Sequence, residues 1–239
     1  QYGGKYVAWT FRKKKKFFDI VTYSGNSTSG RTVSHSLGSV PAMMIIKQTN
    51  GTNAWFVYHK DFIKDSAAAP NSALFLNLAD AGDSNAGYFN NTAPTDSVFT
   101  LGNSSGDWGT NGSGENYVAY LFADNSAEDA DDQMIKCGSF TGNGSVTGPV
   151  VDLGWEPQFL ITKVGNSSHW NMWDSMRGIT AADNDARLYP NLINVEDTSE
   201  KLQLTSTGFQ IKSSSISINT SGVESIYMAI RAPMMNRWG

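Results

Sequence analysis

The sequence predicts an all-β protein built from two tandem homologous antiparallel β-sandwich modules of a jelly-roll or Greek-key kind. Hydrophobic residues make up 40% of the 239 residues and charged residues only 17%, so the surface must be rich in hydroxyl and amide groups, which favours strands and turns. The apolar runs are short, rich in β-branched and aromatic residues, and bounded by Gly, Asn and Pro, as strands between turns are. A long segment of the chain is also repeated.

The internal repeat joins motifs that recur in the same order. Residues 22–26 recur as residues 139–143, and each copy continues through a Leu-Gly-x-x-Pro motif into an apolar run that ends in lysine. The offset between copies falls from 117 at Tyr23/Phe140 to 110 at the closing strands. This one-directional drift indicates an ancestral duplication with small loop deletions. The other matched positions are Lys47 and Lys163, Trp55 and Trp170, Phe99 and Phe209, and Tyr117 and Tyr227.

The repeat sets the domain boundaries. Residues 13–125 are the first β-sandwich repeat, residues 126–133 an acidic linker, and residues 134–239 the second repeat. Residues 1–12 contain Tyr-Val-Ala-Trp, which matches the closing strand of both repeats. We therefore expect residues 1–12 to be either the closing strand of an upstream repeat, in a longer array, or an N-terminal strand that completes the first sheet.

Other elements follow from local sequence. Helical periodicity is almost absent, and the best candidates for a short helix are residues 61–65 and 174–179, each after a Trp-containing strand. The glycine-rich segments 102–106 and 109–114 lack the Gly-Lys-Ser/Thr ending and the helix of a phosphate-binding loop. They are predicted to be flexible hairpin tips.

The two junctions carry opposite charge. Residues 12–16 are basic and residues 124–132 are acidic and without strand formers. The basic run could attract polyanions or be a solvated linker, and basic and acidic junctions of neighbouring subunits could meet in a salt-sensitive assembly.

Composition excludes several classes of protein. No stretch approaches eighteen consecutive apolar residues, and no basic and apolar leader is visible, so neither a membrane span nor a secretion signal is predicted. A net charge of −4 argues against a dedicated nucleic-acid-binding domain. The one cysteine, Cys137, excludes an internal disulfide framework and a thiolate zinc site.

Catalytic patterns are missing from the sequence. No Gly-x-Ser-x-Gly elbow occurs, Cys137 reads as a packing position, and the three histidines lack zinc-ligand spacing. Residues 124–132 and 183–185 could offer oxygen ligands to calcium, but neither has the calcium-loop pattern, so no catalytic residue, metal or cofactor is assigned. The loop acids that would be tested for glycoside hydrolysis are Asp61, Asp80, Asp83, Asp174 and Asp183, and the histidines are His35, His59 and His169.

Aromatic residues are the candidates for surface contact. In the pairs Trp55/Tyr58 and Trp170/Trp173 the rings are three residues apart, so a regular strand places them on opposite faces, one in the core and one outward. The loop aromatics lie among Gly, Asn and Ser, a composition typical of recognition surfaces. These rings are expected to bind a glycan or to be buried against neighbouring subunits. The loop aromatics are Tyr88, Trp108 and Trp155.

The ordered motifs resemble repeats found in structural proteins of tailed phages, especially those of marine bacteria and cyanobacteria. These motifs are Tyr-x-Gly-Asn, Leu-Gly-x-x-Pro, the apolar run with lysine, Trp-x-x-aromatic and the closing Tyr-Val-Ala-Tyr-Leu-Phe. The resemblance covers nearly the whole chain. It implies a non-enzymatic protein of the virion surface, such as a tail fibre, spike or capsid decoration. Its partners would be further copies of itself, as in a trimer, other virion proteins, and a host-surface glycan.

Two alternatives stay open at this point. One is a depolymerase that degrades host capsule, although no acid pair is shared by the two repeats. The other is a secreted bacterial adhesin with the same modules. Differences between the copies at His59/Asp174 and at the insertion 67–71 suit loops that vary for display.

Overall fold

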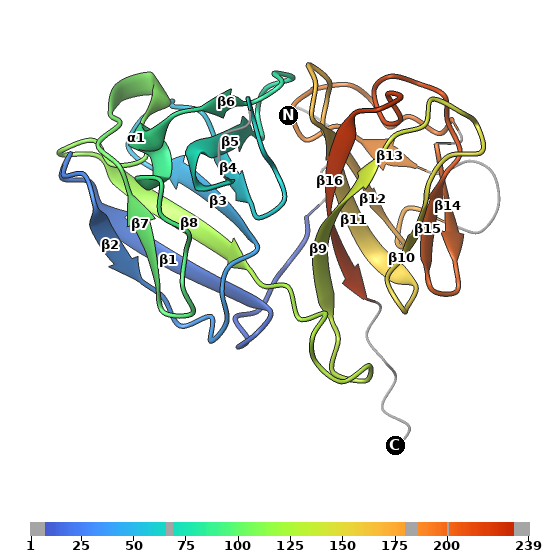
Figure 1. The fold of residues 1–239 in the computed structure, drawn as a ribbon, viewed down its shortest axis with the longest axis horizontal. Helices are drawn as coiled ribbons and strands as arrows, with labels where there is room; N and C mark the ends of the chain where they lie inside the picture. The colour runs from blue at the N-terminus through green and yellow to red at the C-terminus, as the bar shows by residue number, and fades with distance from the viewer. Residues whose placement is uncertain (1–7, 66–68, 180–185, 200, 232–239) are drawn as a thin grey trace, which may run out of the picture.

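The structure is a computed structural model that describes residues 8–65, 69–179, 186–199 and 201–231 (Figure 1). Within these residues the strands pair in antiparallel sheets, and the one α-helix is the four-residue α1 (Ala86–Phe89). Short 3-10 turns occur at η1 (Ala69–Asn71) and η2 (Gly106–Trp108). The predicted all-β antiparallel fold class is confirmed.

The first module contains one large and one small sheet. The large sheet has six strands in the order β1-β8-β3-β4-β5-β6, and β2 and β7 form the small sheet. The strands are β1 (Phe18–Ser24), β2 (Arg31–Ser34), β3 (Met43–Gln48), β4 (Phe56–His59), β5 (Ser72–Phe75), β6 (Asp83–Ser84), β7 (Val98–Leu101) and β8 (Asn116–Phe122).

The second module repeats this plan. Its large sheet has five strands in the order β13-β12-β11-β16-β9, and its small sheet has the order β10-β15-β14. The strands are β9 (Ile135–Thr141), β10 (Val150–Asp152), β11 (Pro157–Val164), β12 (Asn171–Asp174), β13 (Arg187–Leu188), β14 (Leu202–Thr205), β15 (Gly208–Ile211) and β16 (Glu224–Arg231).

The two large sheets share one strand order. The order β1-β8-β3-β4-β5 corresponds to β9-β16-β11-β12-β13, and the pair β2-β7 corresponds to β10-β15. In each module the first strand therefore lies beside the last strand, which in turn pairs with the third. A common topology is what the internal repeat predicts, whereas duplication as its origin stays a prediction.

The strand pairing corrects the alignment of the closing strands. Ile46 pairs with Ala119, and its counterpart Thr162 pairs with Tyr227. The structural equivalent of Tyr227 is thus Ala119, two residues away from the Tyr117 that the sequence pattern suggested. Because side chains alternate with a period of two, a shift of two residues keeps every side chain on the same face.

A buried asparagine supports the repeated Gly-Asn motif in each module. Asn111 accepts a hydrogen bond from the backbone N of Asn26 at 3.1 Å, and Asn219 accepts one from Asn143 at 2.8 Å. Both side chains are completely buried. The segment 109–114 is therefore packed around Asn111 and is not the flexible hairpin tip that its glycines predicted.

The glycine of the same motif is required by a close approach of backbone. A Cβ atom on Gly25 would lie 2.0 Å from the carbonyl oxygen of Gly112, and one on Gly142 would lie 2.2 Å from that of Thr220. No side chain fits at such a distance. The shared Gly-Asn motif thus has a packing role in both modules.

The molecule has four layers, with the two large sheets face to face in the middle and the small sheets outside (Figure 1). One hydrophobic cluster runs from the core of the first module across the contact between the large sheets, where the second module contributes Cys137, Phe159 and Met228. A second cluster, which includes Trp173 and Phe209, fills the space behind the five-stranded sheet. Both faces of the five-stranded sheet are therefore covered, one within the second module and the other by the first module.

Residues 8–13 form no strand. Instead, the ring of Trp9 packs against Phe159, with centroids 6.1 Å apart, and that of Phe11 contacts both Phe159 and Phe122. The segment lies between the two modules because its aromatic side chains pack against apolar side chains of both. Neither predicted role of residues 1–12 as a strand is seen from residue 8 onward, and residues 1–7 lie outside the described residues.

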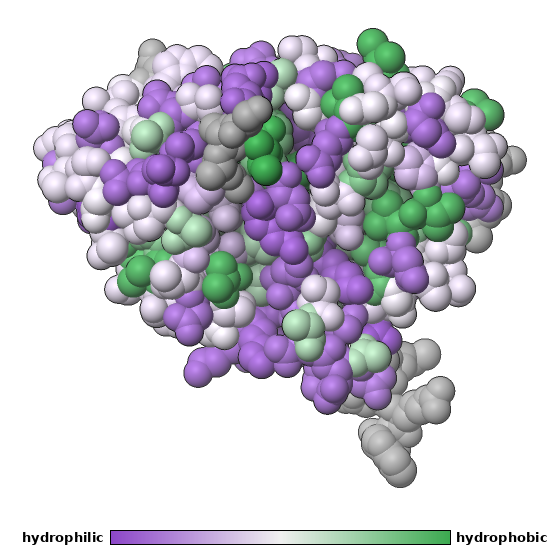
Figure 2. All heavy atoms as spheres, in the orientation of Figure 1, coloured by the Kyte–Doolittle hydropathy of each residue, from purple (hydrophilic) through white to green (hydrophobic). Residues whose placement is uncertain are grey.

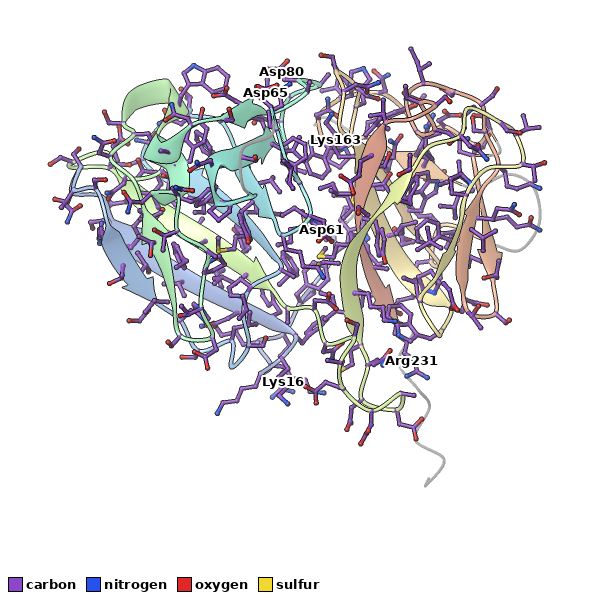
Figure 3. The ribbon with its side chains drawn as sticks, viewed as in Figure 1. Lys16, Asp61, Asp65, Asp80, Lys163 and Arg231 are labelled. Carbon is purple, nitrogen blue, oxygen red and sulfur yellow. The ribbon has the colours of Figure 1, made fainter. Side chains whose placement is uncertain are left out.

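The oppositely charged junctions meet within one chain. Lys16 Nζ lies 2.9 Å from Glu128 Oε1. Figure 2 shows hydrophilic residues gathered at the lower centre of the view, the region in which Figure 3, in the same orientation, labels Lys16. The segment after the linker is held by the buried Asn125, whose Oδ1 accepts from the backbone N of Met134 and of Ile135. Charge pairing between neighbouring subunits is not needed to explain these segments.

The predicted short helices at 61–65 and 174–179 are turns. The helix lies instead at α1, where Asn85 caps its start by accepting from the backbone N of Gly87 at 2.7 Å, and Asn90 ends it in the left-handed conformation. No helix in the described part of the chain has the length and apolar character to cross a bilayer.

Candidate functional site

Most of the aromatic candidates are core residues. Of the seven, Trp55 is half-buried, Trp108 is 48% exposed, and the other five are buried. A buried ring cannot contact a glycan, so the prediction of surface contact is wrong for these five. They are Tyr58, Tyr88, Trp155, Trp170 and Trp173.

The opposite-face prediction holds for Trp170 and Trp173. Trp170 belongs to the cluster that crosses between the modules, and Trp173 belongs to the core of the second module. Trp170 is buried because the first module covers the outward face, and its Nε1 donates to the carbonyl oxygen of Phe75 at 2.8 Å. Trp170 is therefore the outward ring of this pair, and it contributes to the contact between the modules.

Two aromatic candidates keep access to solvent, both near one end of the first module. The ring of Trp108 packs edge-on against Phe75 with centroids 4.9 Å apart. Trp55 precedes Phe56, the ladder partner of Phe75, and Lys47 Nζ lies 6.0 Å from its ring. These two rings remain available for surface contact.

The ionisable side chain of His59, at the contact between the modules, makes hydrogen bonds with both of its ring nitrogens. His59 Nε2 lies 3.1 Å from the carbonyl oxygen of Tyr227, and its Nδ1 accepts from the backbone N of Asp61 at 3.2 Å. These partners assign the proton to Nε2. Complete burial lowers the pKa of His59 to about 4, so the imidazole is neutral. The residue that was interpreted as a variable display loop is thus an interior strand residue.

Cys137 is a packing residue, as predicted. Its Sγ lies 3.7 Å from the carbonyl oxygen of Ala123, and burial raises the pKa of the thiol well above its ordinary value. A nucleophilic cysteine needs the thiolate form and access to solvent. The buried environment of Cys137 disfavours the thiolate and blocks access to solvent.

The lysine that ends each apolar run closes the following turn. Lys163 Nζ donates to the carbonyl oxygens of Val164 and Asn166 at 2.9 and 2.8 Å, and Lys47 does the same for Gly51 and Asn53 at 3.3 and 2.7 Å. Burial lowers the pKa of Lys163 to about 8. Figure 3 places Lys163 beside the contact between the modules. The repeated lysine therefore has a structural explanation.

The acids in the described part of the chain do not assemble into a metal site. No group of three or more His, Cys, Asp or Glu side chains that could hold a metal ion occurs in the described residues. Asp124, from the predicted calcium-binding stretch, pairs with Lys60 at 2.6 Å, and Asp83 accepts from the hydroxyl of Tyr88 at 2.6 Å. Burial raises the pKa of Asp61. Asp183 and its neighbours lie outside the described residues.

A pocket of about 660 Å³ lies between the N-terminal segment and the second module. Residues 8–14 form one wall, and residues 158–159 and 174–177 form the other. Asp174 accepts a hydrogen bond from Trp9 Nε1 at 3.0 Å and pairs with Arg177 Nε at 2.8 Å. This site was not predicted from the sequence because Trp9 was assigned to a strand. The one feature that could have indicated the site is Arg177, three residues after Asp174, where an ion pair across a turn is possible.

A family model described as Domain of unknown function (DUF7483) matches residues 3–232. No curated protein and no solved structure matches the chain.

Proposed function

From the premise that the chain belongs to the DUF7483 family, we propose that it is a non-enzymatic structural protein of a virion surface. In this role it is an appendage, such as a tail fibre, spike or capsid decoration, that displays β modules for assembly and host attachment. The resemblance of its ordered motifs to phage structural repeats supports the location on a virion.

The observation that carries the proposal is the layered contact between the large sheets. Three side-chain hydrogen bonds reinforce the arrangement: Trp170 to Phe75, His59 to Tyr227, and Trp9 to Asp174. Such a contact makes the two modules one stiff block. Stiffness suits display, because a rigid support limits the entropy lost when many weak contacts form together.

The state of the ionisable groups between the modules supports a structural role over hydrolysis. His59 is neutral and hydrogen-bonded on both nitrogens, and Lys60 pairs with Asp124. A general acid or base must instead reach a substrate. We propose that copies of the chain associate on the particle, as in a trimer, and that Trp55 and Trp108 lie on surfaces available to a host glycan.

Analysis of purified particles tests the proposal. Mass spectrometry should detect peptides of this chain at a fixed copy number per particle, and a density map should contain paired β modules on the outside. Absence of the chain from particles would contradict the virion assignment. Sustained release of reducing ends from host capsular polysaccharide by the purified chain would instead favour a depolymerase.

A further inference from the structure

The guanidinium of Arg177 has unused hydrogen-bonding capacity. Its side chain is only 11% exposed, and Nε is 2.8 Å from Asp174 Oδ2. Nη1 and Nη2 are buried and make no hydrogen bond to any of the described residues. Among the described residues, Glu196 Oε2 also lies near the guanidinium, 3.6 Å from Nη1, which is too long for a hydrogen bond. Buried polar groups are nearly always satisfied, so two free guanidinium donors require an explanation.

Arg177 is held in place from two sides. The backbone N and Nε of Arg177 both donate to Asp174, at 2.9 and 2.8 Å. The guanidinium lies 5.3 Å from the ring centroid of Trp9, and Trp9 Nε1 donates to the same carboxylate. The donors are therefore oriented before any ligand arrives, which reduces the entropy lost on binding.

Arg177 is one of the residues that line the 660 Å³ pocket, whose size is within the range of small-molecule sites. Because Nη1 and Nη2 are buried, a ligand must displace the side chains that cover them. Phe11, Phe159 and Ile230 give the pocket apolar surface, and Arg12 and Lys14 add positive charge beside Arg177. Lys13, also in the lining, is paired with Asp19. The pocket thus combines an apolar surface with an excess of cationic donors.

We propose that this pocket binds the carboxylate of an acidic sugar, such as a uronate of a host polysaccharide. Nη1 and Nη2 of Arg177 would donate to the two carboxylate oxygens, a pairing for which the planar guanidinium is suited. The C–H face of the sugar would lie on the apolar surface, and Arg12 would contribute at the rim. This inference rests on the proposed function for the identity of the ligand, whereas the pocket itself can be tested on the purified chain.

Calorimetric titration of the purified full chain with glucuronate tests the proposal, with glucose as the matched neutral sugar. Saturable binding of glucuronate, with none for glucose at the same concentrations, is expected. Arg177→Lys keeps the charge and loses the planar pair of donors, so affinity should fall by at least about tenfold. Arg12→Gln should weaken binding less, and Lys15→Gln, in the same basic segment but outside the pocket lining, should leave it unchanged.

Glu196→Gln gives a test that does not remove a pocket residue. Because Glu196 competes for Arg177 Nη1, its neutralisation should strengthen glucuronate binding. If Arg177→Lys unfolds, the opposite effects of Glu196→Gln and Arg12→Gln still decide the question.

Three results would overturn the inference: no saturable binding of glucuronate, equal binding of glucose, or tighter binding of inorganic phosphate or a polyglutamate peptide. These results are independent of particle composition. A chain that is present in virions and does not bind glucuronate contradicts the inference alone, and a chain that binds glucuronate and is absent from virions contradicts the proposed function alone.

Discussion

The indole Nε1 of Trp170 donates a hydrogen bond to the carbonyl oxygen of Phe75 across 95 residues of chain, at 2.8 Å. The two residues belong to different modules, and Trp170 is almost completely buried between them. This bond shows how the second face of the large sheet in the second module is used. The modules are held by the same kind of packing as each core.

Replacing Trp170 tests the value of this contact. Trp170→Phe removes the donor, and Trp173→Phe is a matched control because Trp173 is also buried but its Nε1 has no hydrogen-bond partner among the described residues. Both variants lose apolar contacts, so the first should be destabilised by about 1 kcal/mol more than the second. Urea unfolding of both variants measures the difference. Equal losses of stability would show that the bond contributes nothing.

His59 should make stability depend on pH. Its pKa is about 4 in the folded chain and 6.5 in the unfolded chain, so the unfolded state binds the proton first as pH falls. Stability should therefore decrease between about pH 6.5 and pH 4, by about 3 kcal/mol in all. Below pH 4 the folded state also takes up the proton, so His59 no longer contributes to the dependence of the free energy of unfolding on pH.

Comparison of variants isolates the contribution of His59. The charged groups that act on it are Lys60 and Asp124, and Asp61 donates its backbone N. These remain in His59→Gln, which should lose the additional slope between pH 6.5 and 4, whereas His169→Gln should keep it. Unfolding curves at several pH values give the slopes. The assignment fails if His59→Gln retains the slope of the parent chain.

The buried asparagines should be equivalent in energy. Asn111 and Asn219 each accept from the Gly-Asn segment of their own module and donate to a second segment, at the carbonyl oxygens of Gly102 and Ser213. Asn111→Ala and Asn219→Ala should each cost about 2 to 4 kcal/mol, because buried partners are left unsatisfied. The exposed Asn103 is the control, and Asn103→Ala should change the free energy of unfolding by less than about 0.5 kcal/mol. A large effect in only one module would argue against a shared structural role.

Cys137 should be inert in the folded chain. Burial raises its pKa, and a thiol reagent reacts with the thiolate. Labelling by a chromogenic disulfide should be slow in buffer and complete at once in denaturant. Rapid labelling of the folded chain would contradict the burial of this residue.

The sequence predicted the fold class more fully than it predicted the contacts between the modules. Short apolar runs and the ordered repeat predicted antiparallel β modules, because both depend on local pattern. The alignment of the closing strands was wrong by two residues at Tyr227, because a two-residue shift preserves the alternation of faces. The register is resolved by the strand pairing, in which Ile46 faces Ala119 and Thr162 faces Tyr227.

The apolar run of β11 indicated a strand that is buried on both faces, but it was interpreted only as a strand of its own module. Seven of the eight residues of β11 are buried, and a strand buried on both faces has a near-continuous apolar run. Periodicity does not identify what covers the second face, so Trp170 was placed at the surface. The pocket around Arg177 had only a local signal, the arginine three residues after Asp174, because its formation depends on Trp9 meeting Asp174 across 165 residues.

Native-state hydrogen exchange across a guanidinium series tests most directly whether the two modules form one cooperative block. The most protected amides of β3 and β8 and those of β11 and β16 should exchange through the same opening, with equal free energies and equal denaturant dependence. Exchange of one module's strands at a markedly lower free energy, while the other module stays protected, would contradict the account.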